Sequence, residues 1–136
     1  MRKIKFKIKN KEHSKIIQHI LFDIGIKWNS TKKFDRFPTP MRLDEPYLFI
    51  SESGYITSSQ QKETYINSTH DEVELIEPEQ RIFLFKLKEL INKPSDKTYG
   101  SEESLDLIKS VLEHGLYYRN DSTALNWLIT VYKDKL

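Results

Sequence analysis

The sequence predicts an α+β fold in which a β-α-β-β-β sheet unit is followed by three helices. Two observations support this. Strand-like apolar runs dominate about residues 1–77, and helical spacing of apolar residues begins at Pro78 and continues to the end. With 136 residues, 38% hydrophobic and 31% charged, the chain has the size of one ordinary domain and enough apolar material for a core. We therefore expect a single domain over residues 1–136, with a sheet unit at 1–77 and a helical extension at 78–136.

The first strand and the first helix are predicted over residues 2–25. Apolar and basic side chains alternate on the strand, with Ile4, Phe6 and Ile8 on one side and Lys3, Lys5, Lys7 and Lys9 on the other. A lysine face suits a solvated or edge position, since stacked like charges discourage another strand from pairing. Asn10 is expected to cap the helix and Gly25 to end it. Its apolar stripe comprises Ile16, Ile17, Ile20, Leu21 and Ile24.

The rest of the sheet unit is predicted from turn signals. After a short strand at 26–28, residues 29–46 are polar and proline-containing and predict a long loop. Two β-rich runs, 47–50 and 55–57, flank a glycine-containing turn and predict a hairpin. A short helix is compatible with residues 58–70, and the apolar residues from Val73 to Ile76 suggest one more strand.

Three helices are predicted after Pro78, which suits a first helical position. The apolar residues of the first of them are Ile82, Phe83, Phe85, Leu87, Leu90 and Ile91. Ser101 is expected to cap the second helix, with two glutamates in its first turn, and Gly115 to end it. Asp121 is expected to cap the last helix.

No enzyme active site is recognisable in the sequence. The absence of cysteine excludes disulfides, cysteine-based zinc sites and a thiol nucleophile. The four glycines are isolated and build no phosphate-binding loop. Structural roles are expected for the four histidines and the adjacent acidic pairs, the histidines being His13, His19, His70 and His114. We therefore predict no catalytic, cofactor-binding or metal-ligating residue and no cofactor.

Basic residues are concentrated at the N-terminal end. Residues 1–42 hold 12 Lys/Arg against 3 Asp/Glu, whereas residues 43–136 hold 10 against 17. Such a region can meet phosphate or an acidic partner, although the two parts can also neutralise each other in the fold. Combined with nearby aromatics it makes a candidate nucleic-acid surface, whose residues are Lys3, Lys5, Lys7, Lys9, Lys32 and Lys33.

The proline-rich loop is a second candidate site. Phe34, Arg36 and Phe37 lie beside Pro38 and Pro40. Exposed aromatics anchor protein interfaces, so these residues are a candidate partner-binding knob. The alternative is that the two rings fold back as a lid on the sheet.

The order of motifs over residues 1–77 resembles that of small accessory proteins of tailed bacteriophages and prophages. The segments that carry the resemblance are Leu21-Phe22-Asp23-Ile24-Gly25, Ile26-Lys27-Trp28, Pro46-Tyr47-Leu48-Phe49-Ile50, Gly54-Tyr55-Ile56-Thr57 and Glu72-Val73-Glu74-Leu75. The resemblance implies an early-expressed protein that binds a host protein, redirecting host metabolism or blunting a defence system. It implies no catalytic residues, and the helices after Pro78 lie outside it.

The sequence therefore predicts a phage-type protein that binds a host protein, through the proline-rich loop or the C-terminal helices. A nucleic-acid-binding protein is the alternative, and a small hydrolase or nuclease is third. The basic start is not followed by the apolar stretch of a signal peptide, and no apolar run approaches the roughly 20 residues that cross a bilayer. We expect the cytoplasm, that of the host cell if the protein is phage-encoded, with no membrane partner. A homodimer through the C-terminal helices is compatible with this prediction.

Overall fold

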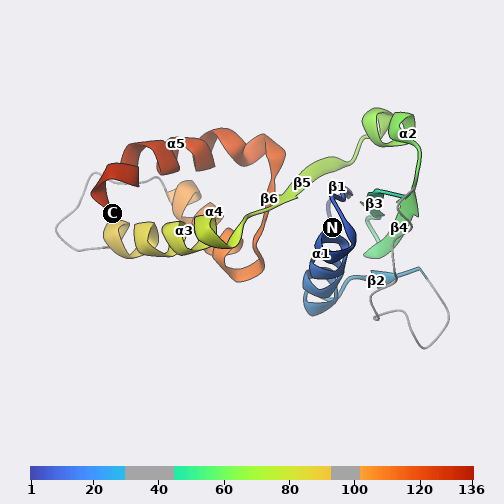
Figure 1. The fold of residues 1–136 in the computed structure, drawn as a ribbon, viewed down its shortest axis with the longest axis horizontal. Coiled ribbons are helices and arrows are strands. Elements are labelled where there is room, and N and C mark those ends of the chain that lie inside the picture. The colour runs from blue at the N-terminus through green and yellow to red at the C-terminus, as the bar shows by residue number, and fades with distance from the viewer. Residues whose placement is uncertain (30–44, 93–101) are drawn as a thin grey trace. The chain divides into compact units, whose positions relative to one another are not determined.

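The computed structural model describes residues 1–29, 45–92 and 102–136, which divide into two compact units, Met1–Val73 and Glu74–Leu136. Its strands are β1 (Ile4–Lys7), β2 (Lys27–Trp28), β3 (Tyr47–Ile50), β4 (Tyr55–Ser59), β5 (Asp71–Leu75) and β6 (Leu116–Tyr118) (Figure 1). Its α-helices are α1 (Lys11–Asp23), α2 (Lys62–Asn67), α3 (Pro78–Ile91), α4 (Glu102–His114) and α5 (Ser122–Tyr132). Two short 3₁₀ helices flank α5, at Arg119–Asp121 and Lys133–Lys135.

The strands form a mixed sheet in the order β2-β4-β3-β1-β5-β6, which confirms the α+β fold. Strand β1 is antiparallel to β3 and parallel to β5. It is therefore an interior strand, and the predicted edge position for its lysine face is wrong. The predicted hairpin is confirmed as β3 and β4, in which Ile50 pairs with Ile56.

Helix α1 begins and ends where the sequence predicts. The Asn10 side chain accepts a hydrogen bond from the His13 backbone N–H at 2.8 Å, which satisfies one of the unpaired N–H groups of the first turn. Gly25 follows the helix with φ +90°, a conformation that costs glycine little and residues with a Cβ more.

The buried face of α1 differs from the predicted stripe. Ile17 and Leu21 are buried as expected, but Ser14 and Gln18 share that face, and two predicted members, Ile16 and Ile24, are exposed. A polar chain explains this burial. Gln18 Nε2 donates to Ser14 Oγ at 2.9 Å, and Trp28 Nε1 donates to Gln18 Oε1 at 3.0 Å. Because these polar groups are paired with one another, their burial carries little desolvation cost.

One face of the sheet in the first unit supplies its apolar core. Ile4 pairs with Ile50 and Phe6 with Leu48 across β1 and β3, and all four side chains are buried. Alternation along β1 places Lys5 and Lys7 on the opposite face. The buried half of the predicted β1 pattern is therefore confirmed.

Helices α3, α4 and α5 share one core in the second unit. Its buried members on the helices are Leu84, Leu87, Ile91, Ile108, Val111, Leu125, Leu128 and Tyr132. Of the predicted α3 stripe, Leu87 and Ile91 are among them, Phe83 and Leu90 are partly buried against this core, and Ile82 and Phe85 are 60% and 54% exposed. The prediction was wrong there because the run Ile82–Phe85 is continuously apolar and does not show which side faces the core.

Gly115 ends α4 as predicted, and an unpredicted strand, β6, follows at once. Gly115 has φ +71°, which turns the chain from helix into strand. Its N–H donates to the Val111 carbonyl at 2.6 Å, and its carbonyl accepts from the Ile76 N–H at 2.7 Å. The turn thus connects the end of α4 with the chain just after β5.

Candidate protein-binding face

The predicted lysine row is interrupted at Lys5. This side chain is 8% exposed, and its Nζ donates to the Tyr65 carbonyl at 2.6 Å and lies 4.6 Å from the centre of the Tyr65 ring. Lys3 donates to Thr69 Oγ1 at 3.2 Å, and only Lys7 and Lys9 are exposed. Lys5 holds helix α2 against the sheet, so the prediction of a continuous solvated lysine face is wrong.

The remaining predicted site residues lie outside the described part of the chain. These are Lys32, Lys33, Phe34, Arg36 and Phe37, together with Ser101, the predicted cap of α4. The proposed roles of the basic loop and of its two phenylalanines stay predictions.

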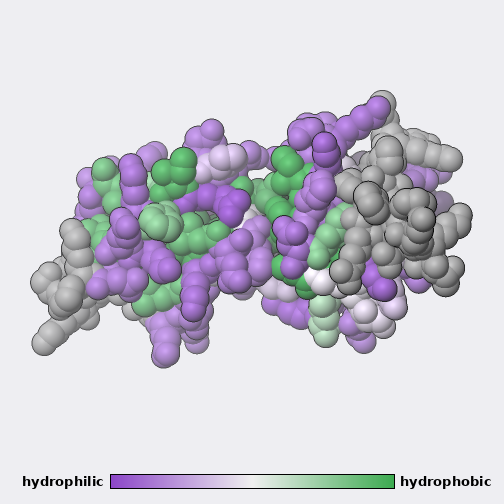
Figure 2. All heavy atoms as spheres, turned by 90° about the horizontal axis from the view of Figure 1, so that it is seen from below, coloured by the Kyte–Doolittle hydropathy of each residue, from purple (hydrophilic) through white to green (hydrophobic). Residues whose placement is uncertain are grey.

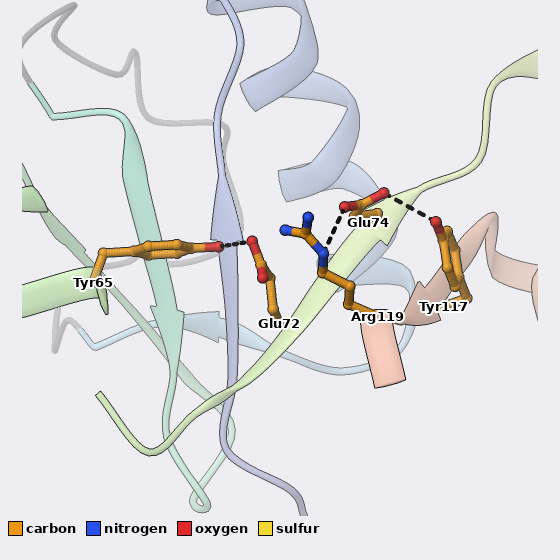
Figure 3. A network of polar contacts seen from close by, with 5 residues as sticks. All are labelled: Tyr65, Glu72, Glu74, Tyr117 and Arg119. Atoms are coloured by element: carbon orange, nitrogen blue, oxygen red, sulfur yellow. Dashed lines mark hydrogen bonds and ion pairs between the residues drawn. The ribbon is translucent and has the colours of Figure 1, made fainter. Parts of the chain in front are cut away.

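Aromatic side chains cover the face of the sheet that carries Lys5. Tyr65 of α2 stacks on Tyr47 with ring centroids 4.7 Å apart, and Phe49 lies 5.3 Å from the His70 ring, edge to face. Tyr65 Oη donates to Glu72 Oε1 at 2.8 Å (Figure 3). The hydroxyl of Tyr65 and the carboxylate of Glu72 are thus engaged in attaching α2 to the sheet.

His70 lies at the rim of this aromatic layer. Its Nδ1 is buried and has no hydrogen-bond partner among the described residues. Burial, and then the positive charges of Lys3 and Lys5, lower the pKa of His70, and the opposing effect of Asp71 is smaller. The neutral imidazole is therefore favoured.

A second polar network joins β5 and β6 within the second unit. Tyr117 Oη donates to Glu74 Oε2 at 2.9 Å, and Arg119 Nε lies 3.7 Å from Glu74 Oε1 (Figure 3). Burial, followed by the hydrogen bond to Glu74 and the charge of Glu74, raises the pKa of Tyr117 to about 12. The network fixes the short strand that the sequence did not predict.

This raised pKa makes stability depend on alkaline pH. The folded state keeps the Tyr117 proton up to about pH 12, whereas an unfolded tyrosine loses it near pH 10. The free energy of unfolding should therefore fall as pH rises from about 10 to 12, and Tyr117→Phe should make that fall shallower. Denaturant unfolding at several pH values measures both slopes. Tyr118→Phe controls for loss of a hydroxyl, and equal slopes in the two variants would contradict the assignment.

Helix α5 presents an exposed face without charge. None of its eleven residues, Ser122–Tyr132, is Asp, Glu, Lys or Arg. Trp127 is 52% and Val131 42% exposed, one helical turn apart. The other exposed side chains are the uncharged Thr123, Asn126 and Thr130. The Trp127 ring meets buried Tyr132 edge to face at 6.4 Å, which supports the ring in one orientation.

Charged residues lie just beyond both ends of α5. Arg119 and Asp121 precede the helix, and Lys133, Asp134 and Lys135 follow it. Figure 2 views the second unit from below, the side away from α5, and shows hydrophobic side chains among hydrophilic ones there as well. An apolar centre with a polar rim is the composition of a protein-binding surface. The absence of charge is visible in the sequence at 122–132 and is the signal that could have pointed to this face.

Neither a metal-binding cluster nor a membrane-spanning helix is found among the described residues. No group of three or more His, Asp or Glu side chains in residues 1–29, 45–92 and 102–136 could hold a metal ion. Within the same ranges no helix has the length and apolar character that a membrane crossing requires. Comparison with known proteins finds no matching family model, no similar curated protein and no similar solved structure.

Proposed function

We propose that this protein acts by binding another protein, with the exposed face of α5 as its contact surface. The observation that carries the proposal is the uncharged, tryptophan-bearing face of that helix. Since 31% of the whole chain is charged, about three of the eleven residues of α5 would be charged at that average. Charged residues are depleted and Trp is enriched at the centres of protein interfaces.

A protein partner fits this face better than a nucleic acid does. Most of the affinity of a protein for a phosphate backbone comes from Lys and Arg, and α5 contains neither. In the first unit, Lys5 is withdrawn into the fold by the Tyr65 carbonyl. Burial of an uncharged helix face, by contrast, removes apolar area from water without stripping water from an ion.

The partner we propose is a bacterial host protein. The motif order of residues 1–77 resembles phage accessory proteins, which supports a role in host takeover or in blunting a host defence, in the host cytoplasm. The α5 face lies in the region that this resemblance does not cover. The assignment of partner contact to the C-terminal helices therefore depends on the α5 face and not on the resemblance.

Trp127→Ala tests the proposal. Tagged protein is used to capture partners from nuclease-treated bacterial lysate, and the affinity for the captured protein is then measured by titration. Truncating an interfacial tryptophan at a hot spot costs about 2 kcal/mol or more, so affinity should fall about 30-fold. Because Trp127 is half exposed, thermal stability should change little.

Ile66→Ala is the matched control, since Ile66 is an exposed hydrophobic residue of α2 in the first unit. It should leave affinity unchanged. A captured protein that binds the Trp127→Ala variant as tightly as the wild type would contradict the α5 assignment. Recovery of nucleic acid alone from a parallel, untreated lysate, and of nothing from the nuclease-treated one, would favour the nucleic-acid alternative.

A further inference from the structure

Helix α3 carries a second exposed apolar pair, Ile82 and Phe85, which the proposed α5 contact does not use. The two residues are three apart and therefore lie on the same side of the helix. At 100° per residue, Pro78 and Glu89 lie on the same side of α3 as this pair, which makes one line of four residues along the helix. Both Pro78 and Glu89 are exposed. The pair lies near the middle of the helix.

The charges beside this pair have a self-complementary arrangement. Glu79 and Lys86 are exposed and seven residues apart, which is nearly two full turns, so they lie along the same edge of the apolar line. They are about 10 Å apart along the helix axis and do not face each other within one helix. An acid and a base on opposite sides of the midpoint of Ile82–Phe85, along one edge, form the pattern that a second, reversed copy would match.

We propose that α3 is a self-association surface and that its occupant is α3 of a second copy, packed antiparallel about a two-fold axis through the middle of Ile82–Phe85. The axis places Ile82 opposite Phe85 of the second copy, twice. Along the helix direction, Glu79 then lies within about 3 Å of the level of Lys86 of the second copy, also twice. Glu89 lies over the N-terminal end of the second α3, where the helix dipole favours an anion.

A parallel pairing does not satisfy the same charges. About a two-fold axis along the helices, the edge with Glu79 and Lys86 would face the opposite edge of the second copy, and Lys86 would lie within about 3 Å of the level of Lys88, which is repulsive. The other edge of the line carries Arg81 and Lys88, but Arg81 is turned into its own unit, where its Nη2 donates to the Leu112 carbonyl at 2.8 Å. Since the apolar contact is small, the dimer should be weak and dependent on concentration.

Analytical ultracentrifugation of the full chain over a wide concentration range tests the proposal. The wild type should shift from monomer to dimer, and Phe85→Glu should stay monomeric. Glu79→Lys alone and Lys86→Glu alone each turn two attractive pairs into repulsive ones, so each should weaken self-association about tenfold. Circular dichroism shows whether each variant is folded.

Mixing the two single variants gives the sharpest comparison. The Glu79→Lys chain has lysine at both positions and the Lys86→Glu chain has glutamate at both, so each repels itself but complements the other. An equimolar mixture should therefore regain the wild-type dimer, as a heterodimer. A wild type that stays monomeric to near-millimolar concentration would overturn the proposal. So would a mixture that does not associate, or a dimer lost in Trp127→Ala and kept in Phe85→Glu.

This inference is independent of the proposed function. Trp127→Ala reports on partner binding and the α3 variants report on self-association, so the failure of either proposal can be told from the failure of the other. Trp127→Ala should leave the sedimentation behaviour unchanged.

Discussion

Lys5→Glu is expected to destabilise the first unit by about 3 kcal/mol or more, because it leaves a buried acceptor unpaired and adds a buried charge without a partner. The substitution places a carboxylate against the Tyr65 carbonyl, which now accepts the Lys5 ammonium at 2.6 Å. It also brings the new charge beside Glu72, the cross-strand neighbour of Lys5 on β5. Denaturant unfolding followed by circular dichroism measures the loss.

Two variants separate the burial of Lys5 from its charge. Lys7→Glu reverses an exposed lysine of the same strand and should change stability by less than about 0.5 kcal/mol. Lys5→Met keeps the apolar stem but leaves the Tyr65 carbonyl unpaired, at a cost of about 1 to 3 kcal/mol. If Lys5→Glu were as stable as Lys7→Glu, the anchoring role of Lys5 would be wrong. Substituting glutamate for all four lysines of the row would therefore test folding, because the row includes Lys5. Lys7 and Lys9 are the residues suited to testing nucleic-acid binding.

Gly115→Ala is expected to destabilise the second unit by about 2 to 5 kcal/mol. A left-handed backbone costs a residue with a Cβ about 1 to 2 kcal/mol, and Gly115 has φ +71°. The added Cβ would also lie 3.3 Å from Leu75 Cδ1 and 3.2 Å from Arg81 Nη1, which is overpacking that typically costs about 1 to 3 kcal/mol. Chemical denaturation of the full chain measures the change.

Gly25→Ala is the matched control for the conformational part of this cost. Gly25 also follows a helix with a positive φ, of +90°, but an added Cβ there meets nothing within 4 Å. The free energy of unfolding of the first unit should fall by only about 1 to 2 kcal/mol in Gly25→Ala. Equal losses at the two glycines would mean that the neighbours of Gly115 move aside without cost.

The sequence by itself determined the class of fold and the positions of most elements. Asn10 and Gly25 marked the ends of α1, alternation marked β1, and the glycine turn marked the β3–β4 hairpin. Each of these signals acts through neighbours within a few residues along the chain. Capping, turn geometry and strand alternation therefore need no knowledge of the tertiary contacts.

The tertiary structure alone decided which side chains of those elements are buried. Lys5 belongs to a regular polar row, yet it is buried because α2, sixty residues later, supplies the carbonyl of Tyr65. Ile82 and Phe85 are exposed although they are apolar, since Leu84 and Leu87 take the core positions of α3. Strand β6 is only three residues long and is held by pairing with β5 and by the hydrogen bond from Tyr117 to Glu74. No local sequence pattern predicts these contacts.

The candidate binding face shows the same division. The lack of charge in residues 122–132 is written in the sequence, but an uncharged helix is equally compatible with full burial. The tertiary packing decided between these outcomes when it placed Leu125, Leu128 and Tyr132 in the core and left Trp127 and Val131 outside. Local patterns along the chain specify which residues share a helix face, whereas burial depends on which distant residues occupy the space beside it.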